Sequence, residues 1–120
     1  MAGIVFLRSQ DLEKMKFFYT SIGSKIWIDQ GDCIIFKHDN FLFGFCEGDK
    51  ISKDGLLTFF YKNKQDVDDI YQRLQQQTAA KPTENTEYNI YNFFTTDPEG
   101  RKLEFQTFLH EIDFSWENYR

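Results

Sequence analysis

Residues 97–105 read DPEGRKLEF, a run of turn residues that leads into alternating polar and apolar positions. Asp97, Pro98 and Gly100 stand where a type I turn prefers these residue types. The glycine also suits a hairpin with a bulge. Such a turn pairs Asp97 with Arg101, so the sequence predicts a bulged β-hairpin centred on this stretch.

The two strands of the hairpin are expected at residues 89–95 and 101–108. Alternate residues of a strand point to the same face, and facing residues of two antiparallel strands form pairs. Counting outward from the turn therefore places four side chains on one face in two facing couples: Asn92 with Gln106, and Phe94 with Glu104.

The same kinds of element recur along the rest of the chain. Strand-like runs occupy residues 4–8, 25–29, 33–37, 41–46 and 56–61, and residues 78–87 are polar and loop-like with room for a short edge strand. Apolar residues recur at helical spacing within residues 12–22 and 67–74. The order is therefore strand, helix and three strands, followed by strand, helix and two or three strands.

This order predicts an α+β domain built from two βαβββ modules. One module has too few strands to cover both faces of its sheet, whereas two side by side form an eight-stranded, curved, mixed sheet. The helices would cover the outer face and leave a concave cleft for a ligand. We expect one domain over residues 1–120, with modules at about 3–48 and 55–109 and a tail at 110–120.

Three segments together resemble the glyoxalase/bleomycin-resistance/extradiol-dioxygenase (vicinal oxygen chelate) superfamily. They are LRSQDLEK at residues 7–14 with FFY at 17–19, DVD at 66–68 with YQRL at 71–74, and DPEGRKLEF at 97–105. The resemblance spans about residues 4–108 and implies the paired-module fold described above.

Metal-dependent members of this superfamily hold a divalent cation with His, Gln or Glu on four strands. The corresponding positions here fall on Ile4, near Gly44, within residues 56–58, and on Glu104. Only Glu104 keeps a ligand-type side chain, and a catalytic site of this kind needs about three protein ligands. The resemblance therefore favours the metal-free, bleomycin-resistance-like members, with no cofactor, over the enzymes.

The resemblance and strand alternation together give a set of candidate ligand-binding residues. Those expected to face the cleft are Ile4, Phe6, Arg8, Asn92, Phe94, Glu104 and Gln106. Arg8 suits a ligand carboxylate or phosphate. The alternative for Arg8 is an ion pair with Glu104 or with a surface acid. For Glu104 the corresponding alternative is a carboxylate that is paired with Arg8 or partly solvated.

Composition excludes some classes of function. The formal net charge is −5 and no basic run exists, which argues against nucleic acid as a partner. No apolar stretch is long enough for a membrane span, and the first residues do not form a signal peptide, so we expect a cytoplasmic protein. Aromatic residues make up 18% of the chain, more than a small core needs, so some should line a cavity or an interface.

The histidines and cysteines do not indicate a catalytic or metal site in the sequence. His38 lies in a predicted turn and His110 beyond the last strand, and both are expected to be solvated. For Cys33 and Cys46 we expect buried reduced thiols, with a disulfide as the lesser alternative. The tail contains apolar residues that imply docking on its own domain, on a partner subunit or over the cleft: Ile112, Phe114, Trp116 and Tyr119.

Three functions fit these observations. The favoured hypothesis is a metal-free protein that binds a hydrophobic or aromatic small molecule, as an antibiotic-resistance-like member of the superfamily would. The resemblance also implies a homodimer, because members of the superfamily commonly form one. The alternative is a metal-dependent lyase, isomerase or dioxygenase with a non-standard metal site, for which Cys46, Glu47, Glu104 and His110 could supply ligands. The third is a domain that makes only protein contacts.

Overall fold

A computed structural model describes residues 2–78 and 80–112 of the chain. In chain order its elements are β1 (Val5–Ser9), α1 (Leu12–Ser21), β2 (Lys25–Asp29), β3 (Cys33–His38), β4 (Phe41–Glu47), β5 (Leu56–Tyr61), α2 (Lys64–Leu74), the short 3-10 helix η1 (Gln75–Gln77), β6 (Thr83–Asn85), β7 (Ile90–Thr96) and β8 (Lys102–Phe108).

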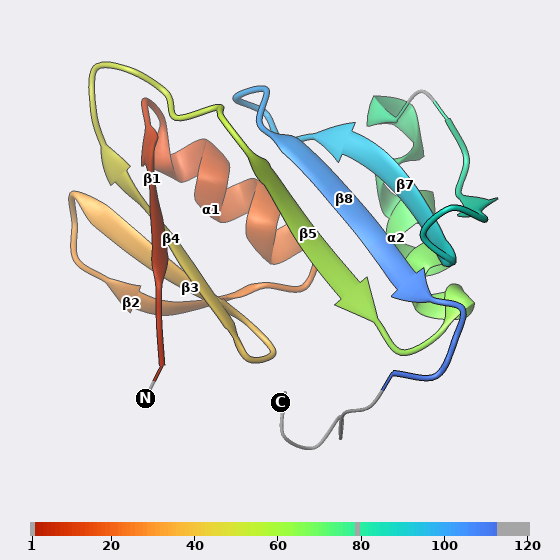
Figure 1. The fold of residues 1–120 in the computed structure, drawn as a ribbon. Helices are drawn as coiled ribbons and strands as arrows, with labels where there is room; N and C mark the ends of the chain where they lie inside the picture. The colour runs from red at the N-terminus through yellow and green to blue at the C-terminus, as the bar shows by residue number, and fades with distance from the viewer. Residues whose placement is uncertain (1, 79, 113–120) are drawn as a thin grey trace. The chain divides into compact units, whose positions relative to one another are not determined.

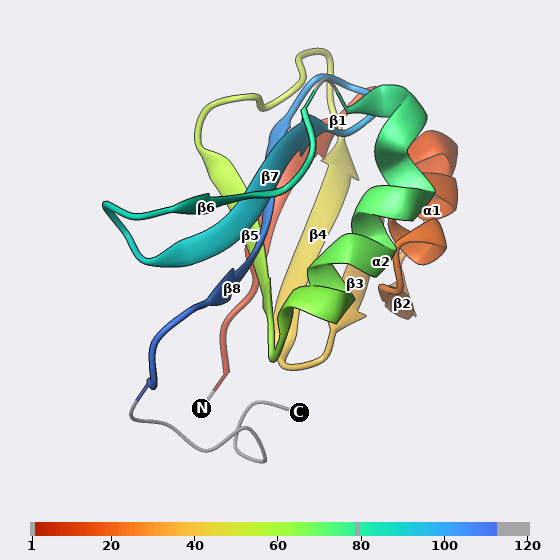
Figure 2. The ribbon, with the colours of Figure 1, turned by 90° about the vertical axis from the view of Figure 1, so that its right-hand side faces the viewer.

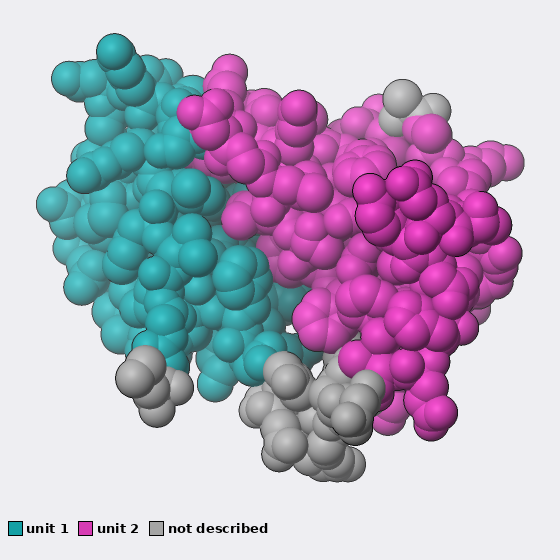
Figure 3. Space-filling view, in the orientation of Figure 1, with its two compact units in different colours: residues 1–52, 114–120 teal, residues 53–113 magenta. Residues whose placement is uncertain are grey.

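Two compact units account for the described residues (Figure 3). The first comprises residues 2–52, and the second comprises residues 53–78 and 80–112. Each unit holds its own sheet and its own α-helix, as Figure 1 shows. The units are described in turn below.

The first unit contains a four-stranded mixed sheet in the order β1-β4-β3-β2. β1 runs parallel to β4, and the other neighbouring strands are antiparallel. Helix α1 packs against β2, β3 and β4 (Figure 1). Asp11 caps this helix by accepting a 3.1 Å hydrogen bond from the Lys14 backbone N–H, and Gly23 follows its end with φ +104°.

Tyr19 of α1 forms the centre of the first core. Its ring centroid lies 5.2 Å from those of Phe43 and Phe45 and 5.5 Å from that of Phe36. All four rings are fully buried. Phe43 and Phe45 alternate with Gly44 along β4, so the helix-facing side of the sheet is aromatic while Gly44 belongs to the opposite side.

The second unit repeats this arrangement with the order β5-β8-β7-β6. β5 runs parallel to β8, and α2 packs against β5, β7 and β8 (Figure 2). Phe105 of β8 stacks between Phe59 and Phe93, with ring centroids at 5.3 and 5.2 Å. The α+β class and the two βαβββ modules are thus confirmed, and the described strands hydrogen-bond as two four-stranded sheets, one in each unit.

The β7–β8 hairpin has the predicted bulged turn. The Gly100 N–H donates to the Asp97 carbonyl at 2.9 Å, and the Asp97 N–H donates to the Arg101 carbonyl at 3.0 Å. The Arg101 guanidinium also forms 2.9 Å ion pairs with the Asp97 and Glu99 carboxylates, and all three side chains are buried. Buried charges are tolerated when they are paired in this way.

The expectation of reduced cysteines was wrong. Cys33 and Cys46 are directly opposite each other on the antiparallel strands β3 and β4, and a disulfide joins them. The sequence did not predict this pairing, because Cys33 and Cys46 become neighbours only when the β3–β4 hairpin forms in this register.

Neither of the described α-helices has the length and apolar character needed to cross a membrane. Of the apolar tail residues, Phe114, Trp116 and Tyr119 lie outside the described residues, and so does the predicted docking of that segment.

Candidate functional site

A buried polar cluster lies on the sheet face of the second unit that points away from α2. Its centre is Glu104 of β8, whose side chain is enclosed although it is ionisable: the residue is 7% exposed. Thr58 Oγ1 donates to Glu104 Oε1 at 2.9 Å, and Asn92 Nδ2 donates to Glu104 Oε2 at 2.8 Å. Gln106 lies next along the strand on the same face and is also buried.

Strand register builds this cluster. Thr58 of β5 is the parallel partner of Glu104, and Phe94 of β7 is its antiparallel partner. Asn92 is the partner of Gln106. Both couples predicted from the hairpin turn are therefore confirmed, and period-two alternation brings their side chains to one face.

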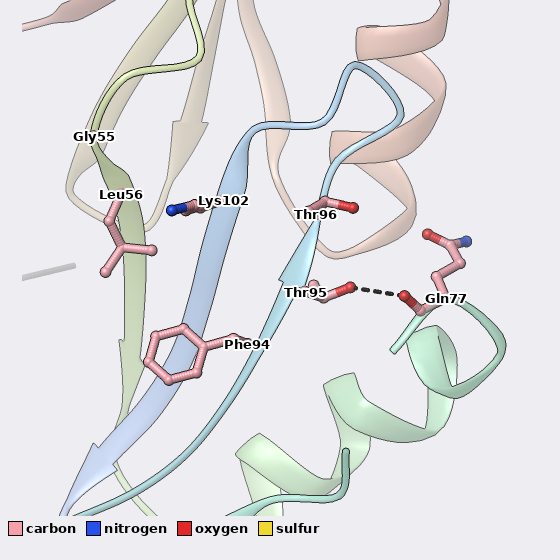
Figure 4. Close-up of a pocket in the computed structure, with 7 residues that line it drawn as sticks. All are labelled: Gly55, Leu56, Gln77, Phe94, Thr95, Thr96 and Lys102. Atoms are coloured by element: carbon pink, nitrogen blue, oxygen red, sulfur yellow. Dashed lines mark hydrogen bonds between the residues drawn. The ribbon is translucent and has the colours of Figure 1, made fainter. Parts of the chain in front are cut away.

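Phe94 differs from its polar neighbours because it is solvated, with 58% of its surface exposed. A hollow of about 780 Å³ adjoins it, lined by Gly55, Leu56, Gln77, Phe94, Thr95, Thr96 and Lys102 (Figure 4). Leu56 and Lys102 are register partners, so they share the face of Phe94. Figure 4 shows Thr95 pointing the other way, where its hydroxyl donates to the Gln77 carbonyl at 3.3 Å.

A second hollow adjoins the same ring. It has a volume of about 680 Å³ and is lined by Ala80, Lys81, Thr83, Glu84, Asn85, Thr86, Glu87, Asn92, Phe93 and Phe94. Asn92 lines this hollow and also belongs to the Glu104 cluster. Small-molecule sites are typically concave and lined by apolar and aromatic side chains with a few polar groups.

Three candidate residues lie in the first unit. Ile4 precedes β1 and is exposed, whereas Phe6 and Arg8 lie on β1 itself. Phe6 and Arg8 line a hollow of about 310 Å³ together with Leu7 and Cys46. The Arg8 guanidinium donates to the Glu47 carbonyl at 3.4 Å.

Gly44 leaves room for the Phe6 ring on this face of the sheet. A Cβ at position 44 would be 2.7 Å from the Ile34 carbonyl oxygen and 2.9 Å from Cε1 of Phe6. The Phe6 ring therefore occupies the space that a side chain at position 44 would need. Gly44 and Phe6 are also register partners, so the two residues are adjacent by construction of the sheet.

The side chains present do not fit the superfamily's metal site. Both oxygens of Glu104 already accept hydrogen bonds from Thr58 and Asn92. At position 44, the Phe6 ring excludes a ligand side chain. The described residues contain no group of three or more His, Cys, Asp or Glu side chains arranged to hold a metal ion.

The expectation of a solvated His38 was wrong. His38 ends β3 and is partly buried, and its Nδ1 lies 2.8 Å from the Ser24 hydroxyl. Burial lowers the pKa of the imidazole below its ordinary value of 6.5, and the Asp39 carboxylate opposes that shift. His110 is exposed, as predicted.

Two contributors to the site escaped the sequence reasoning. Thr58 was noted only as lacking a metal ligand, yet its hydroxyl holds Glu104. Lys102, which lies two residues before Glu104 on the same face of β8, lines the hollow beside Phe94 and was not among the candidate residues. Only the parallel β5–β8 register brings these residues together, and that pairing joins segments far apart in the sequence.

No protein-family model matches the sequence, and no curated protein matches it. Solved structures do match. A glyoxalase/bleomycin resistance protein/dioxygenase from Alicyclobacillus acidocaldarius is 19% identical, with 92% of each chain covered and a TM-score of 0.74. Lactoylglutathione lyase from Agrobacterium tumefaciens is 17% identical, with 89% of this chain and 92% of the other covered and a TM-score of 0.72.

A genomically encoded fosfomycin resistance protein from Listeria monocytogenes is also similar, at 14% identity, with 89% of this chain and 92% of the other covered and a TM-score of 0.74. Paired βαβββ modules define the class of fold. The chain has the fold that the glyoxalase/bleomycin-resistance/dioxygenase proteins share.

Proposed function

We propose that this protein binds a hydrophobic or aromatic small molecule without the help of a metal ion. The observation that carries the proposal is the exposed ring of Phe94, which lies between two hollows and beside a buried polar cluster. When a ligand covers an aromatic ring that is exposed to water, apolar surface is removed from water and the binding free energy becomes more favourable.

The size and lining of the hollows suit such a ligand. Drug-sized sites have volumes of roughly 300 to 1,000 Å³ and combine apolar walls with few polar groups. Phe94 and Leu56 supply apolar surface, and Lys102 supplies a cation for an anionic group on the ligand. Asn92 and Gln106 offer amides whose positions are held by the sheet.

The Glu104 cluster has a supporting role in this proposal. Its carboxylate orients the Asn92 amide through the 2.8 Å hydrogen bond, so the amide is held in a defined position for a ligand. Ile4, Phe6 and Arg8 remain proposed ligand-binding residues of the first unit, with Arg8 available to a carboxylate or phosphate. No bond of the ligand is broken, and sequestration is the whole mechanism.

The remaining features of the proposal concern organisation. We propose a single domain over residues 1–120 that acts as a homodimer, has no nucleic-acid partner and is located in the cytoplasm. The Cys33–Cys46 disulfide would be unusual in the cytoplasm, because disulfides are rare in the cytosol and those found there are usually redox-active. Cell fractionation tests the location, and light scattering tests the dimer.

A binding experiment tests the proposed function. Purified protein is titrated by calorimetry with a panel of aromatic compounds, with and without a carboxylate, and with fosfomycin. Phe94→Ala removes the exposed ring, and Phe17→Ala is the matched control because Phe17 is 80% exposed on α1 and lines neither hollow.

We expect Phe94→Ala to weaken binding of any hit roughly tenfold or more, since covering a phenylalanine side chain contributes about 1.5–3 kcal/mol. Phe17→Ala should bind as the parent does. If no compound binds, or if Phe94→Ala binds as tightly as the parent, the proposal is wrong.

A further inference from the structure

The Cys33–Cys46 disulfide lies on the face of the first sheet that points away from α1. Cys46 is the antiparallel partner of Cys33 and the parallel partner of Arg8. Phe43 and Phe45, which alternate with Gly44 and Cys46 along β4, are buried under α1. Strand alternation therefore directs the Cys46 side chain to the open face, together with Phe6 and Arg8.

This disulfide is accessible. Cys33 and Cys46 are both partly exposed, unlike the adjacent Ile34 and Phe45, which are fully buried. Cys46 also lines the hollow of about 310 Å³, and Cys33 does not. A small thiol entering this hollow therefore meets the sulfur of Cys46 first.

Arg8 gives the hollow a positive charge. Its side chain is exposed and passes close to Gly48, where a Cβ would lie 3.2 Å from Arg8 Cδ. The backbone of Gly48, which follows β4, therefore restricts the direction of the Arg8 side chain. The guanidinium donates to the Glu47 carbonyl. No carboxylate is among the residues that line this hollow in the described part of the chain.

The geometry points to Cys46 as a thiol–disulfide exchange site that prefers small anionic thiols. The thiolate of the incoming compound attacks Cys46 Sγ, the Cys33–Cys46 bond breaks, and Cys33 leaves as a thiolate that takes up a proton from water. A second thiolate then attacks the external sulfur of the mixed disulfide. It releases an oxidised dimer of the small thiol and leaves Cys46 as a thiolate, so two electrons pass from the thiols to the protein.

Arg8 acts in this reaction by attraction. An anionic thiol carries a second negative charge besides its thiolate, and a nearby guanidinium raises the local concentration of such a compound. It also stabilises negative charge on the attacking and leaving sulfurs. The inference does not depend on the proposed ligand, whose test uses Phe94 in the second unit.

The experiment compares the rates at which three monothiols reduce the folded protein at low ionic strength: mercaptoethanesulfonate (anionic), 2-mercaptoethanol (neutral) and cysteamine (cationic). Arg8→Gln removes the charge and Arg8→Lys keeps it. Lys37→Gln is the matched control, because it removes one positive charge from the same sheet at the far end of β3 from Cys33. Each variant is compared with the parent in the same thiol, so differences between the thiols cancel.

We expect Arg8→Gln to slow reduction by mercaptoethanesulfonate about threefold or more, and to slow reduction by 2-mercaptoethanol by a clearly smaller factor, because only the first thiol carries a second negative charge. Arg8→Lys and Lys37→Gln should keep the parent's rates. Equal slowing with all three thiols, or an unchanged rate with the anionic thiol, would overturn the proposal. Thermal melting of each variant confirms that the protein is folded.

A second measurement identifies the sulfur that is attacked. Acid quenching of the partly reduced protein, followed by peptide mass mapping, should find the mercaptoethanesulfonate adduct on Cys46. An adduct confined to Cys33 would overturn the proposal, and so would two free thiols in protein purified under air without reductant.

Discussion

The side-chain amide of Asn92 donates a 2.8 Å hydrogen bond to Glu104 Oε2. Both residues are buried, and they lie on the face of the second sheet that points away from α2. Thr58 satisfies the other carboxylate oxygen from a strand on the opposite side of β8. Glu104 is therefore held by hydrogen-bond donors from both neighbouring strands.

Replacing Asn92 with alanine should destabilise the protein. The change leaves one oxygen of a buried carboxylate without its donor, at a cost of about 1–3 kcal/mol in the free energy of unfolding. Urea denaturation measures this difference. Thr83→Ala is the control, since Thr83 is the exposed β6 partner of Asn92 and should change stability little. Equal stability of Asn92→Ala and the parent would contradict the role given to this hydrogen bond.

Replacing Arg101 with methionine should be more damaging. Arg101 pairs with the buried carboxylates of Asp97 and Glu99 at 2.9 Å, and its removal leaves two uncompensated charges in the hairpin. We expect a loss of about 3–5 kcal/mol in the free energy of unfolding. Lys102→Met changes the same charge at the next, exposed position and should cost far less. Similar losses in both variants would show that the buried pairs are not responsible.

Stability should fall as the solution is acidified below about pH 6.5, with His38 responsible for part of the loss. Burial lowers the pKa of the folded imidazole, so the unfolded chain takes up the proton more readily. The contribution of His38 is complete above the pKa of the unfolded state and declines as the pH falls toward the folded pKa.

His38→Gln should flatten this part of the pH dependence, which urea denaturation at a series of pH values measures. Asn40→Ala is the control, because Asn40 is exposed near His38 and carries no titratable group. A parent protein that gains stability between pH 6.5 and 5, or a profile that His38→Gln leaves as steep as the parent's, would contradict the assignment.

Metal ions should neither bind stoichiometrically nor stabilise the protein. After incubation with Zn²⁺, Ni²⁺ or Mn²⁺ and desalting, elemental analysis should find less than about 0.1 equivalent, because Glu104 lacks the two further ligands such a site needs. The melting temperature should not change with a chelator. Stoichiometric metal that disappears in Glu104→Gln would instead support the metal-dependent alternative.

Much of the fold could be predicted because its signals are local. Asp97, Pro98 and Gly100 specify a turn within a few residues, and turn geometry propagates into the pairing of Asn92 with Gln106 through strand alternation. Strand β5 has the predicted bounds, Leu56–Tyr61, because a run of apolar and aromatic residues ends at polar neighbours. The paired βαβββ order follows from such local patterns.

The sequence by itself determined the elements, their order and the alternation that separates core from open face. The tertiary structure alone decided which distant side chains meet. Thr58 and Glu104 are 46 residues apart, Ser24 and His38 are 14 apart, and Cys33 and Cys46 are 13 apart. Each contact depends on the order and register of the strands. Burial of a whole sheet against its helix sets that order and register, so the local sequence around the contacting residues does not predict the contact.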